Sequence, residues 1–414
     1  MSFFCHHFGV NSVQAAGIII EYNPLHGGHL RLLTELRRRL GADTAVIGVM
    51  SGDFVQRGDF AILRRQARAK AAVESGVDLV LELPLPWAVA SAERFADGGI
   101  QVLSGTGLVT DLVFGSECGD CGILMQAAQT LLCPELDLRI RAELFQKDSY
   151  AAARQRALAS LIGPEPAAVL AAPNNILGVE YCKALLRQNS PIRPVTVLRI
   201  GAGYHETEHN GTLPSATLIR KLLREGNRQQ ALDLMAPAMA AAYAEEEAAG
   251  RAPVFMETCE RAVLARLRSM TPADFSALDQ GREGLGNRLY EASREAASLQ
   301  AILEKAKTRR YAYTRLRRMV LWAYLGLTAS ELPAAVPYLR VLACNAVGRS
   351  LLVRMRKTAS IPLLTKPADV RLLGAEARRL FTMEAHAADL YALAYPDLSA
   401  ASGGQLWREH PVIR

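Results

Sequence analysis

Strand-like and helix-like stretches alternate along the first half of the chain, and this alternation limits the folds available to it. Short apolar runs predict strands, at residues 18–20, 44–50, 78–83, 111–114 and 194–200. Helical patterns lie between them, at residues 30–40, 63–74, 89–103 and 122–132. Strands separated by helices of this length form a parallel sheet with right-handed crossovers and helices on both faces. We therefore predict an α/β fold with a Rossmann-like, doubly wound parallel sheet.

The turn after the first strand contains two histidines three positions apart. Asn23-Pro24 ends the strand, and Gly27-Gly28 lets the backbone approach a ligand closely. The start of the helix that follows carries free N–H groups and the positive end of the helix dipole, which favour a bound phosphate. His26 and His29 can point at the same anion. In doubly wound sheets, ligands bind beyond the carboxyl ends of the strands, which is where this turn lies.

Two other interpretations of the histidine pair remain open at this point. The pair can serve helix capping and packing alone. It can also ligate zinc, although no Glu lies between the two histidines and no third ligand is apparent.

A second helix start carries a hydroxyl residue and an arginine one turn later. Ser215 and Thr217 precede Arg220, so the helix N–H groups and the guanidinium can hold the β- and γ-phosphates of a nucleotide. The alternative is a plain Ser N-cap. Together with the histidines, the arrangement favours the phosphate clamp over the plain N-cap.

The character of the chain changes near residue 226, where Ala-, Leu- and Arg-rich helical patterns replace the alternation. The next strand signal comes only at residues 338–343. A chain of 414 residues, 50% of them hydrophobic, can build more than one core. We predict an N-terminal extension (residues 1–15), an α/β catalytic domain (16–225) and a mainly α-helical domain (226–414).

Composition excludes several classes of protein. No apolar run is long enough to span a bilayer, and the first residues lack the apolar core of a secretory signal. The seven cysteines are mostly far apart, which suits a reducing cytoplasm. Cys118 and Cys121 form a Cys-x-x-Cys without a second pair, so a redox or metal role stays open. The net charge of +7 suits a polyanionic partner without identifying one.

The two phosphate motifs resemble those of a known superfamily. The segment from His26 to His29 is similar to the His-x-Gly-His signature of the nucleotidyltransferases, which attack the α-phosphate of ATP and release pyrophosphate. The segment from Ser215 to Arg220 resembles the Ser/Thr-Arg motif of the same superfamily. One departure is Pro214, where the family usually has Ser, because proline removes an N–H that could meet a phosphate.

Further segments closely resemble the bacterial tRNA(Met) cytidine acetate ligase family. In the first half they are residues 22–24, 50–58, 114–117, 173–178 and 199–205. In the second half they are residues 283–288, 307–315, 338–342, 365–369 and 388–396. The resemblance therefore covers about residues 16–396.

The resemblance implies a specific reaction. Family members use ATP and acetate to make acetyl-adenylate, and then acetylate N4 of the wobble cytidine of elongator tRNA(Met). It implies catalytic roles for His26, His29 and Arg220. The expected ATP-binding residues are Ile19, Glu21, Tyr22, Asn23, Pro24, Gly28, Leu32, Gly115, Asn174, Asn175, Arg199, Ser215 and Thr217. Of the two asparagines we favour Asn175. Mg²⁺ is expected with ATP, although no dedicated protein metal site is predicted.

Two segments are candidates for contact with the RNA. Residues 305–318 combine positive charges, which bind phosphates, with tyrosines, which can stack on unpaired bases. A basic amphipathic helix packed on its own domain is the alternative, since the same stretch has an apolar stripe. The predicted tRNA contacts here are Lys307, Arg309, Arg310, Tyr313 and Arg315. In the loop after the second strand, Asp53, Gln56 and Arg57 are expected to line the acceptor pocket, with a solvated loop as the alternative.

Three functions fit the sequence. The first is the acetate ligase, with tRNA(Met) and acetate as partners and no membrane. The second is a small-molecule adenylyltransferase of the same superfamily, and the third is a tRNA-binding protein with a regulatory nucleotide site. The long helical second half favours the first over the second, and the two histidines with Arg220 favour catalysis over binding alone.

Overall fold

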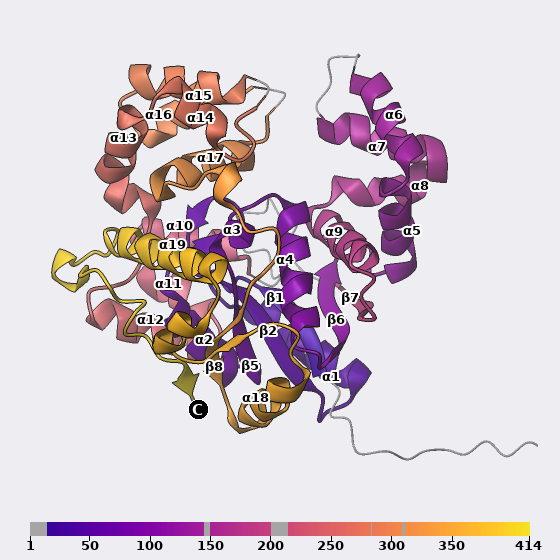
Figure 1. Ribbon diagram of the computed structural model, residues 1–414, viewed down its shortest axis with the longest axis horizontal. Helices are drawn as coiled ribbons and strands as arrows, with labels where there is room; N and C mark the ends of the chain where they lie inside the picture. Colours follow the sequence, from indigo (N-terminus) through magenta and orange to yellow (C-terminus); the bar gives the residue numbers. More distant parts are fainter. Residues whose placement is uncertain (1–14, 145–149, 200–213, 283, 309–310) are drawn as a thin grey trace, which may run out of the picture.

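The structure is a computed structural model that describes residues 15–144, 150–199, 214–282, 284–308 and 311–414 (Figure 1). The predicted N-terminal extension therefore lies outside the described residues, except for Ala15, which begins the first strand. Also outside them are Ile200 at the predicted end of the fifth strand and the predicted tRNA contacts Arg309 and Arg310. None of the described helices is long and apolar enough to cross a membrane.

The predicted doubly wound parallel sheet is confirmed. Its five parallel strands are β1 (Ala15–Ile20), β2 (Ala45–Ser51), β5 (Leu79–Leu83), β6 (Val109–Ser116) and β7 (Arg193–Leu198). They lie in the order β5-β2-β1-β6-β7, so the strand order reverses at β1. Ligands in such sheets bind beyond the strand ends at this reversal.

The central strands β1 and β2 are almost entirely apolar because helices cover both faces of the sheet. In β2, Ile47 and Val49 belong to one hydrophobic core, whereas Val46 and Met50 belong to the core on the opposite face. This alternation follows from the two-residue period of a strand. The helices in the core of Ile47 and Val49 include α4 (Ala92–Gly105) and α9 (Pro173–Arg187). Those in the core of Val46 and Met50 include α1 (Gly27–Leu40) and α2 (Arg65–Glu74).

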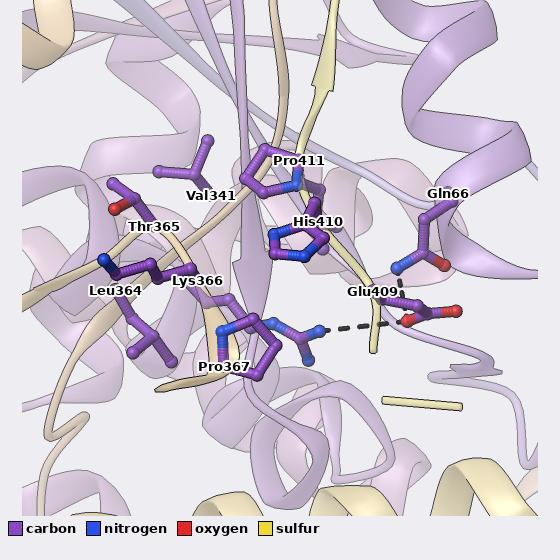
Figure 2. Close-up of a pocket in the computed structure, with 11 residues that line it drawn as sticks. Gln66, Val341, Leu364, Thr365, Lys366, Pro367, Glu409, His410 and Pro411 are labelled. Atoms are coloured by element: carbon purple, nitrogen blue, oxygen red, sulfur yellow. Dashed lines mark hydrogen bonds and ion pairs between the residues drawn. The ribbon is translucent and has the colours of Figure 1, made fainter. Parts of the chain in front are cut away.

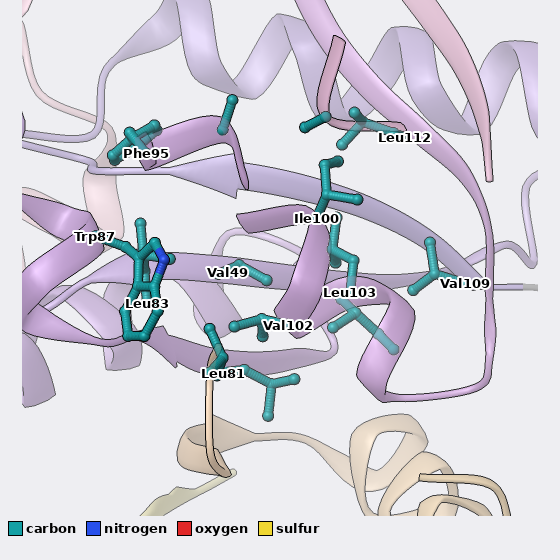
Figure 3. Packing of buried hydrophobic residues seen from close by; sticks show 14 of the residues in the cluster. Val49, Leu81, Leu83, Trp87, Phe95, Ile100, Val102, Leu103, Val109 and Leu112 are labelled. Atoms are coloured by element: carbon teal, nitrogen blue, oxygen red, sulfur yellow. The ribbon is translucent and has the colours of Figure 1, made fainter. Parts of the chain in front are cut away.

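Figure 3 shows part of the first of these cores. Phe95, Ile100 and Leu103 of α4 pack with Val49 and Leu81 of the sheet. We predicted one helix over residues 89–103, and the structure has one there, α4, which begins only at Ala92 after a break from the short helix α3 (Leu85–Ala88). The break occurs because the Ser91 side chain caps α4 by accepting a hydrogen bond from the Arg94 N–H.

The prediction of a separate domain over residues 226–414 needs correction. Strand β8 (Leu339–Cys344) pairs antiparallel with β5, and β10 (Val412–Ile413) and β9 (Leu363–Leu364) pair with β8. Every residue of β8 is buried, so this strand needs a sheet to cover it. The last part of the chain therefore extends the same sheet. Its helices are α18 (Ala346–Thr358) and α19 (Ala375–Ala392).

The helices directly after residue 214 also pack on the sheet. They are α10 (Ala216–Arg224), α11 (Arg228–Asp233) and α12 (Pro237–Ala248), and they share a core with α1 and α2. The separate helical region is therefore limited to about residues 256–327, which we call the helical lobe. Its core is distinct from the two cores beside the sheet, although residues of α3 and α19 also belong to it. The helices of the lobe are α13 (Glu260–Ser269), α14 (Pro272–Ala277), α15 (Leu285–Glu295), α16 (Leu299–Ala306) and α17 (Tyr313–Leu325).

A second group of helices follows β6, and in Figure 1 it stands on the opposite side of the molecule from the helical lobe. Its members are α5 (Cys121–Leu131), α6 (Pro134–Leu144), α7 (Tyr150–Ile162) and α8 (Pro164–Ala167). A short hairpin of β3 (Phe54–Val55) and β4 (Asp59–Phe60) follows β2 and packs against the helical lobe.

Buried ion pairs join the hairpin loop, the sheet and the C-terminal segment. Arg65 contacts both Asp53 and Glu82, and Arg340 of β8 reaches the other oxygen of Glu82 at 2.9 Å. Nearby, Glu409 contacts Gln66 and Arg340 beside a cavity of about 10 Å³ (Figure 2). A space of this size holds about one water molecule and no substrate.

Candidate active site

The main cavity of the described residues, about 380 Å³, opens at the carboxyl ends of β1 and β6, where the strand order reverses. This volume suits a small-molecule ligand. Its lining includes residues from the N-terminal ends of α1, α9 and α10, together with Arg57 and Asp59 of the hairpin. The positive dipole ends of α1 and α10 therefore meet at one space, which favours an anion, whereas the first N–H groups of α9 already donate to the carboxylate of Glu117.

His26 and His29 are fixed at the start of α1 by a reciprocal capping arrangement. Nδ1 of His26 accepts a hydrogen bond from the Gly28 N–H at 3.1 Å, and Nδ1 of His29 accepts one from the His26 N–H at 3.2 Å. A neutral imidazole that accepts at Nδ1 carries its proton on Nε2. Each ring therefore keeps one N–H donor for a ligand, and the predicted capping role and the predicted phosphate role are compatible.

Both histidines favour the neutral form. Burial, together with the positive charges of Arg199 and Arg220, lowers the pKa of His26 to about 4. Burial also lowers the pKa of His29 well below its usual value, with smaller effects from His26 and Arg199. At neutral pH the two rings are therefore hydrogen-bond donors to phosphate rather than permanent cations.

The lowered pKa of His26 predicts a pH dependence of stability. The unfolded chain binds a proton at this residue near pH 6.5, but the folded chain does so only near pH 4. The unfolded state therefore binds more protons in between, and the free energy of unfolding should fall by about 2 kcal/mol between pH 7 and pH 5. Urea denaturation at the two pH values measures this change. His26→Asn keeps a capping side chain and should reduce the fall, and an equal fall in both proteins would contradict the assignment.

Ser215 and Arg220 approach the same cavity from α10. The Ser215 hydroxyl accepts a hydrogen bond from the Leu218 N–H at 3.1 Å, so it is the N-cap of the helix as well as part of the lining. Arg220 donates to the Asn23 carbonyl at 2.6 Å, which holds its guanidinium beside the His-x-Gly-His turn. Burial lowers the pKa of Arg220. The structure thus brings His26, His29 and Arg220 to one cavity.

Gly115 and Arg199 form the opposite side of the cavity, at the ends of β6 and β7. A Cβ atom on Gly115 would lie 3.1 Å from Cγ of Arg199, closer than most side-chain contacts. Glycine at this position therefore leaves room for the arginine side chain beside the sheet. The backbone N–H of Arg199 donates to the Ser116 carbonyl, which fixes where the side chain starts.

The two asparagines at the start of α9 have different roles. Asn174 lines the cavity and donates from its side chain to Glu117 at 2.7 Å. Asn175 is buried, and its side-chain oxygen accepts from the Cys118 N–H at 3.0 Å. Our preference for Asn175 as the nucleotide contact is therefore not supported, because its amide oxygen already holds the loop after β6.

Most of the predicted ATP-binding residues lie in the lining of the cavity. Besides Asn175, Pro24 is absent from the lining and follows a cis peptide bond after Asn23. Those present are Ile19, Glu21, Tyr22, Asn23, Gly28, Leu32, Gly115, Asn174, Arg199, Ser215 and Thr217. The side chain of Asn23 faces elsewhere, because its oxygen accepts from the Ile62 N–H.

Of the three residues predicted to line the acceptor pocket, only Arg57 belongs to the lining of the main cavity, and its contact with the acceptor stays a prediction. Asp53 is buried and bonded to the backbone and guanidinium of Arg65. Gln56 donates from its side chain to the Ala90 carbonyl. The alternative of a solvated loop is also wrong for Asp53, which holds the loop through an ion pair.

Lys307, Tyr313 and Arg315, which we predicted to contact tRNA, lie on the helical lobe and not in the lining of the cavity. Lys307 donates to two backbone carbonyls, the Tyr313 hydroxyl donates to Gln300, and Arg315 donates to the Gln280 carbonyl. Helix α17 packs its apolar stripe into the core of the lobe. The structure thus shows the alternative arrangement, a basic amphipathic helix packed on its own domain. The contacts of these residues with RNA stay predictions.

Sequence reasoning missed several lining residues, including Asp59, Tyr181 and Arg31. Asp59 is 2.8 Å from Arg317 of α17 and 3.7 Å from Arg224 of α10, so it joins the cavity rim to the helical lobe. For Asp59, the one available signal in the sequence was that it directly follows residues 50–58, a segment that resembles the family. Tyr181 lies in the middle of α9 and carries no local signal.

Comparisons with known proteins agree with this geometry. A family model described as HIGH Nucleotidyl Transferase matches residues 13–405. The tRNA(Met) cytidine acetate ligase of Acetivibrio thermocellus is 37% identical, over 97% of this chain and 100% of its own length. The crystal structure of Thermotoga maritima TmcAL bound with alpha-thio ATP has a TM-score of 0.90 and 32% identity, and covers 97% of this chain and 99% of its own. The apo form of TmcAL gives a TM-score of 0.92 at 33% identity.

These matches and the paired histidines define the chain as a nucleotidyltransferase of the HIGH class. Relatives at this identity over nearly the full length then decide the family. The chain belongs to the tRNA(Met) cytidine acetate ligase family.

Proposed function

We propose that this protein uses ATP and acetate to form acetyl-adenylate and transfers the acetyl group to N4 of the wobble cytidine of elongator tRNA(Met). The observation that carries the proposal is the convergence of His26, His29 and Arg220 on one cavity at the strand reversal. The names of the relatives supply the acceptor. In this proposal, the residues of the cavity bind and orient the triphosphate of ATP so that acetate can attack its α-phosphorus.

The residues of the cavity suit the charge changes of adenylation. Acetate attacks the α-phosphorus, a P–O bond forms, and pyrophosphate leaves with the electron pair of the broken bond. Negative charge therefore grows on the leaving group. The Nε2–H donors of the histidines and the Arg220 guanidinium are suited to bind it. Because these donors are already fixed by capping and by the Asn23 carbonyl, little reorganisation is needed.

Mg²⁺ belongs to the proposal as a companion of ATP. The part of the chain that the structure describes has no group of three His, Cys, Asp or Glu side chains suited to a metal ion. Phosphate oxygens and water are therefore the proposed principal ligands, as is common for Mg²⁺ bound with nucleotides. The predicted cytoplasmic location also stays a prediction.

One incubation tests the proposed function against its alternatives. Purified protein is mixed with ATP, labelled acetate and elongator tRNA(Met), and the RNA is digested to nucleosides. We expect labelled N4-acetylcytidine. A new dinucleotide without labelled RNA would favour the small-molecule adenylyltransferase, and RNA binding without turnover would favour a regulatory nucleotide site.

The helical lobe is the proposed tRNA-binding surface, and Arg315→Ala tests it. We expect a weaker affinity for tRNA(Met), by about three- to tenfold at low salt, and a shallower salt dependence because one cation is lost. Acetyl-adenylate formation should be unchanged, since Arg315 is not in the cavity lining. Dissociation constants at several salt concentrations give the result. The control is Arg228→Ala on α11, which removes an arginine paired with Glu247. Identical salt slopes in the wild type and Arg315→Ala would contradict the prediction.

A further inference from the structure

Glu21 follows directly after β1 and places a carboxylate in the lining of the cavity. Its Oε1 accepts hydrogen bonds from the Gln56 N–H at 2.7 Å and from the Ser51 hydroxyl at 3.4 Å. Its Oε2 accepts no hydrogen bond from any described residue. A carboxylate is repelled by a triphosphate, so the side chain of Glu21 is poorly suited to the phosphate-binding role expected for this stretch.

The other two carboxylates of the lining are already engaged. Glu117 accepts from the N–H groups of Asn174 and Asn175 and from the Asn174 side chain, so it caps α9 with both oxygens. Asp59 lies between Arg317 and Arg224. Among the lining acids that the structure describes, Glu21 is therefore the one with an oxygen available to a ligand.

Glu21 also lies on the side of the cavity that faces the helical lobe. Gly115 and Arg199 line the side formed by β6 and β7, whereas both partners of Glu21 come from the end of β2 and the hairpin after it. The hairpin touches α17 closely. A Cβ on Gly58 would lie 2.4 Å from the backbone nitrogen of Arg318, and Arg317 donates to the Gly58 carbonyl. A nucleotide delivered from the helical lobe therefore reaches the cavity on the side of Glu21.

We propose that Glu21 is the catalytic residue that receives the cytidine amine, with its Oε2 accepting a hydrogen bond from N4 and then taking the N4 proton. The new N4–C bond forms at the acetyl carbonyl, and the C–O bond to the adenylate phosphate breaks. AMP leaves with that electron pair, and the proton from N4 moves to Glu21. A carboxylate also selects cytosine over uracil, because uracil has an acceptor oxygen at the same position.

The surroundings of Glu21 suit this role. Burial raises the pKa of its carboxyl, which makes the carboxylate a stronger base than an exposed glutamate. The hydrogen bond from Gln56 and the charges of Arg57, Arg68 and Arg220 limit the rise. The Gln56 N–H also fixes Oε1, so that Oε2 keeps one orientation.

Glu21→Gln tests the inference, which rests on the proposed acetyl transfer. The Gln56 N–H should hold the amide oxygen of the new side chain and leave its NH₂ group facing N4, so that two donors meet. We expect the single-turnover rate of transfer to fall at least 100-fold, while acetate-dependent ATP–pyrophosphate exchange and the tRNA dissociation constant stay within about threefold. The wild-type transfer rate should rise with pH along a limb that Glu21→Gln lacks.

Glu35→Gln is the matched control, because Glu35 is a carboxylate of α1 that contacts Arg38 outside the cavity lining. It should leave both half-reactions unchanged. A comparable loss of exchange and transfer in Glu21→Gln would overturn the inference by placing Glu21 in adenylation, and an unchanged transfer rate would overturn it directly. Absence of N4-acetylcytidine with the wild-type protein would instead defeat the proposed function.

Discussion

His29→Ala is expected to slow acetyl-adenylate formation by about 10²–10³-fold, the usual cost of losing one fixed donor to a developing oxyanion. The substitution removes the His29 ring and with it the Nε2–H donor. It also removes Nδ1 of His29, which accepts a hydrogen bond from the His26 N–H at 3.2 Å. Loss of half of the capping arrangement should also lower the free energy of unfolding by about 1 kcal/mol. Acetate-dependent ATP–pyrophosphate exchange measures the first effect, and urea denaturation measures the second.

The affinity for tRNA separates a lost catalytic group from a damaged fold. Because His29 lies in the cavity and not on the helical lobe, the tRNA dissociation constant of His29→Ala should stay within about twofold of the wild type. His386→Ala on α19 is the control, since this histidine is exposed and lies outside the cavity. A parallel loss of exchange and tRNA binding would indicate misfolding, and full exchange activity would mean that His29 does not bind the leaving group.

Arg65→Ala should lower the free energy of unfolding by about 3–5 kcal/mol, which is the typical cost of removing one partner from a buried ion pair. The side chains of Arg65, Asp53 and Glu82 are 3%, 5% and 3% exposed, so water cannot replace the lost guanidinium. Arg340 still reaches Glu82, but Asp53 keeps no other ion-pair partner among the described residues. Chemical denaturation gives the difference directly.

Arg139→Ala provides the contrast on the surface. Arg139 and Glu135 form an ion pair of α6, with side chains 41% and 56% exposed. Its loss should change the free energy of unfolding by less than about 1 kcal/mol, because exposed pairs are weak. If Arg65→Ala cost no more than this control, the buried network would have no special role in stability.

The sequence predicted the nucleotide-binding half of the protein well, because its signals are local. Buried strands such as β2 are recognised by an unbroken apolar run, and the His-x-Gly-His turn lies directly between a strand and a helix. The end of β1 therefore followed from residues that are neighbours in the chain. Arg220 was also found, since its position one turn after a Ser N-cap is a local pattern.

The errors involve contacts between distant parts of the chain. Strand β8 looked isolated within a helical region, and only its pairing with β5, more than 250 residues earlier, shows that it belongs to the sheet. Asn174 and Asn175 are neighbours in the chain, but their roles differ. The side-chain oxygen of Asn175 is taken up by a hydrogen bond from the N–H of Cys118, which belongs to another loop. Asp53 was assigned to the cavity since its partner Arg65 could not be identified from spacing alone.

The return of the chain to the sheet has a consequence for how the protein is made. Strand β8 covers the edge of β5, and β10 covers the edge of β8, so that edge of the sheet stays open during translation until residues 339–413 have left the ribosome. Arg340, which neutralises Glu82, arrives with the same segment. The sheet is therefore completed only after the helical lobe has been synthesised, and the edge of β5 is the last part of the sheet to be covered.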